Sequence, residues 1–226
     1  MIYPKTCWYR EVCSKAPGHC TPDCIRYKCM LAMLKRSNIP EGAWVPKQLY
    51  PGADLEAFRR LAHIKNKINP WVKNGHNLYL YSAGCGNGKT SWAFKLALAY
   101  LNSVWDTSAA FRAPVIYMSV PEFFERERQS IRGTQSGFEE LKEALISADL
   151  VIWDDITAVR MTEYNFSLLQ NYIDARVVNG KSNIFTGNYP ESNLADFVGE
   201  KLCSRICSTS EQIEFVDRDK RGMRNG

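Results

Sequence analysis

The chain has 226 residues, of which 45% are hydrophobic and 23% are charged, the balance of an ordinary globular protein. This composition excludes intrinsically disordered, collagen-like and low-complexity proteins. The net charge is +5. All of it comes from residues 1–50, which carry eight Lys/Arg and three Asp/Glu, because residues 51–226 carry 21 of each sign. Five of the eight cysteines also fall within the first 29 residues, so the sequence consists of two differently composed pieces.

The chain carries no signal for a membrane or for secretion. No segment approaches the roughly 18 consecutive apolar residues of a membrane span, and the first residues, MIYPKTCWYR, lack the apolar core of a signal peptide. We therefore expect a cytoplasmic protein, in a bacterium or inside a bacterial cell, with no membrane partner. Because that compartment is reducing, clustered cysteines indicate a metal site rather than disulfides.

Three regions follow one another along the chain. The cysteine-rich start leads into a helical pattern, and we expect both to form a small metal-binding module over residues 1–36. Residues 37–53 contain three prolines, which break regular structure and indicate a linker. The remaining residues, 54–226, are expected to form one larger domain.

Strand and helix patterns alternate in this larger domain. Apolar or aromatic runs predict strands at 78–83, 114–120, 150–155, 183–188 and 211–216. Helical spacing of apolar residues covers 54–69, 90–101, 121–130, 137–148, 165–178 and 193–206. This alternation is typical of an α/β protein whose parallel sheet is covered by helices on both faces.

A glycine-rich segment lies between the first predicted strand of this domain and the next helix. Its sequence, AGCGNGKT, has the spacing of a phosphate-binding P-loop, with Ala83 replacing the usual first glycine. Lys89 would reach the β- and γ-phosphates of a nucleotide, and the Thr90 hydroxyl would bind Mg²⁺. The candidate nucleotide-binding residues are Ala83, Gly84, Cys85, Gly86, Asn87, Gly88, Lys89, Thr90 and Ser91. The alternative is a glycine-rich turn without a ligand.

Two carboxylates end the apolar run LVIWDD at residues 150–155. Parallel sheets bind ligands at the carboxyl ends of their strands, so Asp154 would lie beside the P-loop and hold Mg²⁺. Asp155 would polarise the attacking water as general base. The alternative is that both acids cap the following helix.

Three later residues are further candidates. Asn188 ends the strand NIFTGN and would orient the attacking water, unless it only forms a turn before Pro190. Arg205 would act on the nucleotide of a neighbouring subunit, with a surface salt bridge as the alternative. Arg221 would contact a phosphate in its own subunit, or lie in a solvated tail.

The P-loop, the LVIWDD strand, the TGN strand tip and the SRI arginine together resemble the AAA+ ATPases of the initiator/loader group. The chain is most similar to the bacterial and phage replicative-helicase loaders of the DnaC/DnaI type, over roughly residues 50–226. This resemblance implies a P-loop (ASCE) fold with strand order 5-1-4-3-2. It also implies Mg-ATP bound between self-associating subunits, single-stranded DNA as a ligand, and delivery of a hexameric replicative helicase to DNA.

The family's site residues correspond to residues of this sequence. The resemblance gives the P-loop roles to Lys89 and Thr90, the Walker B roles to Asp154 and Asp155, sensor 1 to Asn188, the arginine finger to Arg205 and sensor 2 to Arg221. Asp155 stands where many relatives have Glu, which implies slow hydrolysis. The chain ends about 20 residues after Arg205, which implies a reduced or absent helical lid. Gly187 stands where the family often has Ser.

The cysteine cluster indicates a zinc site, because structural zinc takes four nitrogen or sulfur ligands. The candidate ligands are Cys7, Cys13, Cys20 and Cys24, with His19 as a possible substitute. Cys29 is left out because it shares a predicted apolar helix face with Ile25, Ala32 and Met33. An iron–sulfur cluster and unligated thiols are the alternatives. Four zinc-bound thiolates would reduce the local charge of +5 to about +3, which favours a protein partner over nucleic acid at this module.

The segment between the second and third strands of the large domain contains a candidate DNA contact. Phe123, Phe124, Arg126, Arg128 and Arg132 would stack on bases and hold phosphates. Glutamates alternate with these arginines, so a solvated salt-bridge face is the alternative.

The leading function is an ATP-dependent helicase loader in which slow ATP hydrolysis acts as a switch. One alternative is a transposition-helper ATPase that remodels DNA. The other is a zinc-module nucleic-acid-binding protein with structural, weakly hydrolysed ATP.

Overall fold

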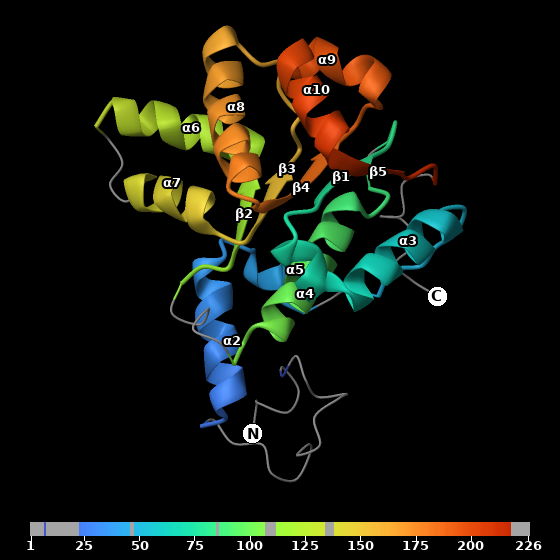
Figure 1. Cartoon of the computed structure of the whole chain (residues 1–226), viewed down its shortest axis with the longest axis vertical. Coiled ribbons are helices and arrows are strands. Elements are labelled where there is room, and N and C mark those ends of the chain that lie inside the picture. The colour runs from blue at the N-terminus through green and yellow to red at the C-terminus, as the bar shows by residue number, and fades with distance from the viewer. Residues whose placement is uncertain are drawn as a thin grey trace.

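Five parallel strands form the centre of the molecule (Figure 1). The computed structural model describes residues 7, 23–45, 48–84, 86–106, 112–133 and 138–217. The strands are β1 (Asn77–Tyr81), β2 (Val115–Ser119), β3 (Leu150–Asp154), β4 (Ser182–Gly187) and β5 (Ser210–Glu214). They pair in the order β2-β3-β4-β1-β5, and every pairing is parallel. This confirms the predicted α/β class and the implied strand order.

Helices cover both faces of the sheet, as the sequence predicts. One face carries α2 (Ile25–Arg36), α3 (Leu55–Asn66), α4 (Ile68–Lys73) and α5 (Lys89–Ser103). The other carries α6 (Val120–Ile131), α7 (Phe138–Ser147), α8 (Glu163–Val178), α9 (Glu191–Val198) and α10 (Glu200–Thr209). A short 3₁₀ helix, η1 (Glu41–Ala43), follows α2. Parallel strands require such crossover connections, since a tight hairpin joins only antiparallel strands.

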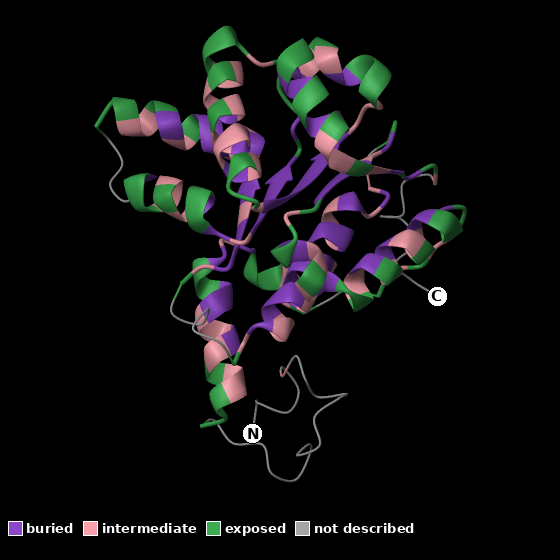
Figure 2. Cartoon of the chain, viewed as in Figure 1, coloured by how far each residue is buried: buried purple, intermediate pink, exposed green. Residues whose placement is uncertain are grey.

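The sheet divides the hydrophobic core into two layers. Successive strand residues point to opposite faces, so Leu78 and Leu80 pack against one set of helices and Tyr79 against the other. All five residues of β3 are buried. Figure 2 shows the buried strands between helices whose outer sides are exposed. The central strands are apolar because they are covered on both sides.

Helix α2 packs onto this core, although the sequence placed it in the N-terminal module. Met30, Met33 and Leu34 are each at most 1% exposed and belong to the same cluster as Leu78 and Leu80. The predicted buried face is wrong at Ile25, which is 72% exposed, and Cys29 is half-buried. The buried stripe follows the i, i+3, i+4 spacing of Met30, Met33 and Leu34 instead. The division into residues 1–36, 37–53 and 54–226 stays a prediction.

Among the described residues, none of the helices combines the length and apolar character needed to cross a bilayer.

The described part of the chain ends at residue 217, just after β5. Arg221 lies beyond it, so the role of that arginine and the lack of a helical lid stay predictions.

Candidate nucleotide-binding site

The predicted phosphate-binding loop joins β1 to α5, as expected for a P-loop. Gly86 and Gly88 have φ angles of 79° and 100°, in the left-handed region that favours glycine. Gly88 is the N-cap of α5, so the unpaired N–H groups of the first turn face the loop and attract an anion. Cys85 lies outside the described residues. The backbone here fits the phosphates of a nucleotide.

Lys89 points back into this loop and is only 6% exposed. Its Nζ donates hydrogen bonds to Ser82 Oγ at 2.6 Å, to Gly84 O at 3.0 Å and to Asn87 Oδ1 at 3.1 Å. These three acceptors are neutral oxygens, and a phosphate oxygen would be a stronger, charge-assisted partner for the ammonium. The sequence analysis missed Ser82, whose only signal is a polar residue directly after an apolar strand.

Asp154 is the second centre of the site, at the carboxyl end of β3. It is 4% exposed, and three hydroxyls donate hydrogen bonds to it. Thr90 Oγ1 lies 2.9 Å and Thr186 Oγ1 2.6 Å from Oδ1, and Tyr117 Oη lies 3.0 Å from Oδ2. The predicted pair of Thr90 and Asp154 is therefore in direct contact. An oxygen-rich pair of this kind suits Mg²⁺, and the metal-binding role of both residues stays a prediction.

Thr186 has a role that the sequence analysis did not assign. The TGN motif marked the tip of β4, but its threonine was given no function. Its Oγ1 donates to Asp154 and accepts the Asp155 N–H at 2.9 Å. Asp155 is exposed and has a φ angle of 57°, a conformation that Asp tolerates better than most residues. Thr186 thus holds the carboxylate of Asp154 and the backbone of Asp155. The general-base role of Asp155 stays a prediction.

Asn188 follows β4, and its N–H donates to Thr157 Oγ1 at 2.9 Å. The preceding Gly187 packs against Tyr79: a Cβ at position 187 would lie 2.6 Å from the Tyr79 hydroxyl. That hydroxyl donates to Tyr189 O at 2.5 Å, so it is held in place. A side chain at position 187 would therefore clash with this hydroxyl, which favours glycine there. The water-orienting role of Asn188 stays a prediction.

Arg205 forms an ion pair on the surface of the subunit. Its Nε lies 2.5 Å from Asp174 Oδ1 of α8, and the two side chains are 42% and 30% exposed. This is the salt bridge that the sequence analysis gave as the alternative. Exposed pairs contribute only about 0–1 kcal/mol, so the contact does not prevent an approach to a neighbouring subunit. The arginine-finger role stays a prediction.

The candidate DNA contacts on α6 are partly wrong. Phe123 and Phe124 are 0% and 4% exposed, and both pack in the core that contains Trp153, so neither stacks on a base. Arg126 pairs with Glu122 at 2.6 Å, and Arg128 pairs with Glu125. The salt-bridge alternative describes Arg126 and Arg128, whereas Glu127 is buried and pairs with Lys142. A DNA contact by the exposed Arg132 stays a prediction. Amphipathic spacing buried the aromatic residues on the side of the helix that faces the sheet.

The zinc prediction falls mostly outside the described residues, which exclude Cys13, His19 and Cys20. Cys24 is exposed and Cys7 is half-buried against the core. Within the described part of the chain, no three His, Cys, Asp or Glu side chains come together as a metal site. Zinc binding therefore stays a prediction.

Comparisons with solved structures find proteins with a similar fold. The chain is similar to a crystal structure of the DnaC helicase loader, with a TM-score of 0.62 and 18% identity over 78% of this chain and 99% of that one. It is similar to a crystal structure of DnaI, with a TM-score of 0.59 and 18% identity over 78% and 94%. It is also similar to AMPPCP-bound DnaA from Aquifex aeolicus, with a TM-score of 0.56 and 20% identity over 78% and 50%.

No protein-family model matches the chain, and no curated protein sequence matches it. The structural likenesses nevertheless show that the chain has the AAA+ P-loop fold. The predicted resemblance to the DnaC/DnaI helicase loaders is confirmed at the level of this fold.

Proposed function

We propose that this protein is an ATP-dependent loader of a hexameric replicative helicase, which acts in the bacterial cytoplasm and places the helicase on single-stranded DNA. ATP binding and hydrolysis act as the switch. The observation that carries the proposal is the convergence of Lys89, Thr90 and Asp154 at the carboxyl edge of an AAA+ sheet. The likeness to the DnaC helicase loader and to DnaA with a bound ATP analogue supports it.

The residues fit a magnesium nucleotide. The left-handed glycines and the start of α5 receive the phosphates, Lys89 exchanges its neutral acceptors for phosphate oxygens, and Thr90 and Asp154 hold Mg²⁺. When bound, Mg²⁺ neutralises charge that develops on the phosphates. Asp155 polarises the attacking water, Asn188 orients it, and Arg205 acts across the interface with a second copy. Because the Asp155 carboxylate is short, we expect slow hydrolysis that DNA or the partner stimulates.

The N-terminal segment is the proposed docking module for the helicase. Cys7, Cys13, Cys20 and Cys24 hold a zinc ion that folds this segment, since few apolar residues are available there to form a core. Metal analysis of protein purified under low oxygen tests this. One zinc per chain is expected, and iron or no metal would contradict it.

Co-purification with the host's hexameric helicase tests the function. Truncating residues 1–45 would remove Met30, Met33 and Leu34 from the core, so the full chain is used. In the presence of ATP, the wild-type protein is expected to associate with the helicase, and the double variant Cys20→Ser/Cys24→Ser is not. Cys29→Ser, outside the proposed ligand set, is the matched control and should still associate. No association of the wild-type protein would remove the loader function.

A further inference from the structure

Helix α2 ends against the free edge of the sheet. Strand β2 is an edge strand that pairs on its inner side with β3. At its outer side, Tyr117 N–H donates to Ser37 O at 2.7 Å, and Asn38 Nδ2 donates to Tyr117 O at 3.0 Å. The two residues that follow α2 therefore satisfy the backbone donor and acceptor that Tyr117 presents at the edge.

The end of α2 is fixed for this contact. Asn38 has a φ angle of 57°, and asparagine is one of the few residues that end a helix in this conformation. Ser37 is fully buried, and its hydroxyl donates to Leu34 O at 2.7 Å. The side chain of Asn38 thus reaches β2 from a rigid helix end, and a shift of α2 moves the backbone of Tyr117.

The side chain of Tyr117 leads from this edge into the nucleotide site. Its hydroxyl donates to Asp154 Oδ2 at 3.0 Å, and its ring centroid lies 4.9 Å from that of Phe94 on α5. An ionised carboxylate can only accept hydrogen bonds, so the tyrosine hydroxyl is the donor in this contact.

We propose that Tyr117 is a positioning residue that couples the position of α2 to the magnesium-binding carboxylate of Asp154. A displacement of α2 would thereby change the affinity for magnesium nucleotide. The inference rests on the proposed function, since it requires that Asp154 binds Mg²⁺ with ATP. A hydrogen bond weakens steeply with distance and angle, so a small movement of Tyr117 releases one oxygen of Asp154. By thermodynamic reciprocity, bound magnesium nucleotide holds the end of α2 more firmly.

Tyr117→Phe in the full chain tests the positioning role. The ring and its packing on Phe94 remain, and only the donor to Asp154 is lost. A titration of Mg²⁺ at a fixed concentration of a fluorescent ATP analogue should show about a tenfold increase in the Mg²⁺ concentration needed for half-maximal binding, called the Mg²⁺ midpoint below. This is the size usual for groups that hydrogen-bond to metal ligands. The affinity for the analogue without Mg²⁺ should be unchanged. A variant that was only structurally damaged would lose this affinity as well.

Asn38→Gly tests the coupling to α2. Glycine keeps the left-handed backbone and removes the amide that bonds Tyr117. The variant should shift the Mg²⁺ midpoint in the same direction, by roughly threefold, and the double variant with Tyr117→Phe should be no worse than Tyr117→Phe alone. The matched control is Asn179→Gly, which removes an asparagine side-chain bond at the end of α8 and should leave the midpoint unchanged.

The outcomes separate this inference from the proposed function. Wild-type protein that shows no Mg²⁺-dependent nucleotide binding would overturn both. Normal wild-type binding with an unchanged midpoint in Tyr117→Phe would overturn the positioning role alone. Full additivity of the Asn38→Gly and Tyr117→Phe shifts would overturn the coupling. A second readout is hydrogen exchange of the Tyr117 amide. In the wild type this exchange should slow when magnesium nucleotide binds, and in Asn38→Gly its rate should be the same with and without nucleotide.

Discussion

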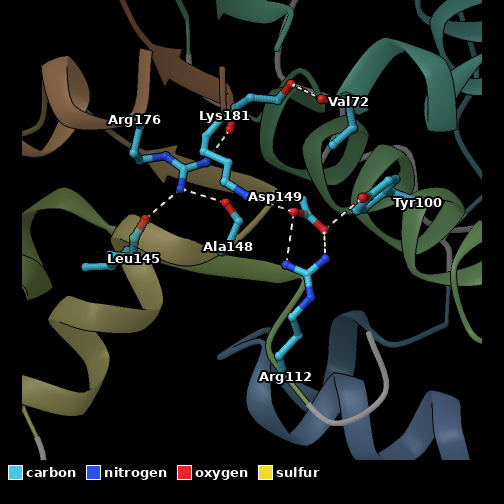
Figure 3. Close-up of polar contacts among 9 residues, drawn as sticks. Val72, Tyr100, Arg112, Leu145, Ala148, Asp149, Arg176 and Lys181 are labelled. Carbon is cyan, nitrogen blue, oxygen red and sulfur yellow. Dashed lines mark hydrogen bonds and ion pairs between the residues drawn. The ribbon is translucent and has the colours of Figure 1, made fainter. Parts of the chain in front are cut away.

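An aspartate lies at each end of strand β3: Asp149 is partly buried and Asp154 is buried, and different kinds of partner hold the two carboxylates. Asp149 lies just before the strand and accepts hydrogen bonds from Tyr100 and from two cations, Arg112 and Lys181 (Figure 3). Asp154 ends the strand, and its three donors are neutral hydroxyls. The charge of Asp149 is therefore balanced by fixed side chains, whereas that of Asp154 is oriented by hydroxyls and ready to bind a cation.

The amino end of the sheet also has a cavity of about 430 Å³, which Asn69, Tyr100, Arg112, Asp149 and Lys181 help to line. Helices α4, α5 and α8 end around it, and cations near helix C-termini offset the negative end of the helix dipole. Close by, the fully buried Arg176 donates to the carbonyls of Leu145, Ala148 and Ser182. Buried polar groups alone thus do not mark a functional site, because here they are the partners of fixed backbone groups.

The largest expected effect is on stability at the amino end. Arg176→Met leaves three buried carbonyls and Asn183 Oδ1 without this donor, which should lower the free energy of unfolding by about 3–5 kcal/mol. Urea denaturation measures it. Arg112→Met, the same change at a half-exposed position, should cost no more than about 1–2 kcal/mol. Equal losses of unfolding free energy in the two variants would show that burial of the Arg176 hydrogen bonds adds nothing to their contribution to stability.

The second-largest expected effect is on nucleotide binding at the carboxyl end of the sheet. Thr186→Val keeps the shape of the side chain but removes the hydroxyl that holds Asp154 and the Asp155 N–H. Mg²⁺-dependent nucleotide affinity should fall about 10–100-fold. Thr209→Val, whose hydroxyl bonds only within α10, is the matched control in the same calorimetric titration. Unchanged affinity in Thr186→Val would mean that Asp154 does not need this orientation.

The smallest effect concerns the pH dependence of the amino end. Burial raises the pKa of Asp149, but hydrogen bonds and charges from Arg112 and Lys181 outweigh burial and place its pKa below the usual 3.8. A lowered folded pKa stabilises the protein fully above the unfolded pKa, about 3.9. This contribution is lost as the pH falls from there through the lower pKa of the folded state. Asp149→Asn should therefore cost about 1–2 kcal/mol at pH 7 and flatten the loss of stability below about pH 4.

Urea denaturation at several pH values measures this difference. Asp106→Asn, at an exposed position, should leave the free energy of unfolding at pH 7 unchanged. An Asp149→Asn protein with the same acid sensitivity as the wild type would show that Asp149 is not bound as strongly as the ion pairs indicate.

Much of the fold and the centre of the site could be predicted from the sequence. Alternating strand and helix patterns indicated the covered parallel sheet, and the glycine spacing with LVIWDD located Lys89, Thr90 and Asp154. These signals are local: each depends on residues close together in the chain. The P-loop and the acidic strand end were sufficient because their positions in a parallel sheet follow from the fold.

The remaining features depend on contacts between distant segments. Thr186 and Tyr117 meet Asp154 from strands β4 and β2. Their roles follow from the register of these strands and from which side chains point to Asp154, and neither could be predicted from the sequence. Helix α2 looked like part of a separate module because its packing partner comes from the sheet. Phe123 was predicted to contact DNA because helical periodicity identifies an apolar face but not what packs against it, which here is the protein core.

The most direct test of the central claim is a calorimetric titration of Mg-ATP into the wild-type protein and into Lys89→Ala, both checked for folding by circular dichroism. The site at the carboxyl end predicts one nucleotide per chain for the wild type. It predicts at least about a hundredfold weaker binding for the variant, since the ammonium that meets the phosphates is lost. Equal affinity in the two proteins, or no binding by the wild type, would contradict the account.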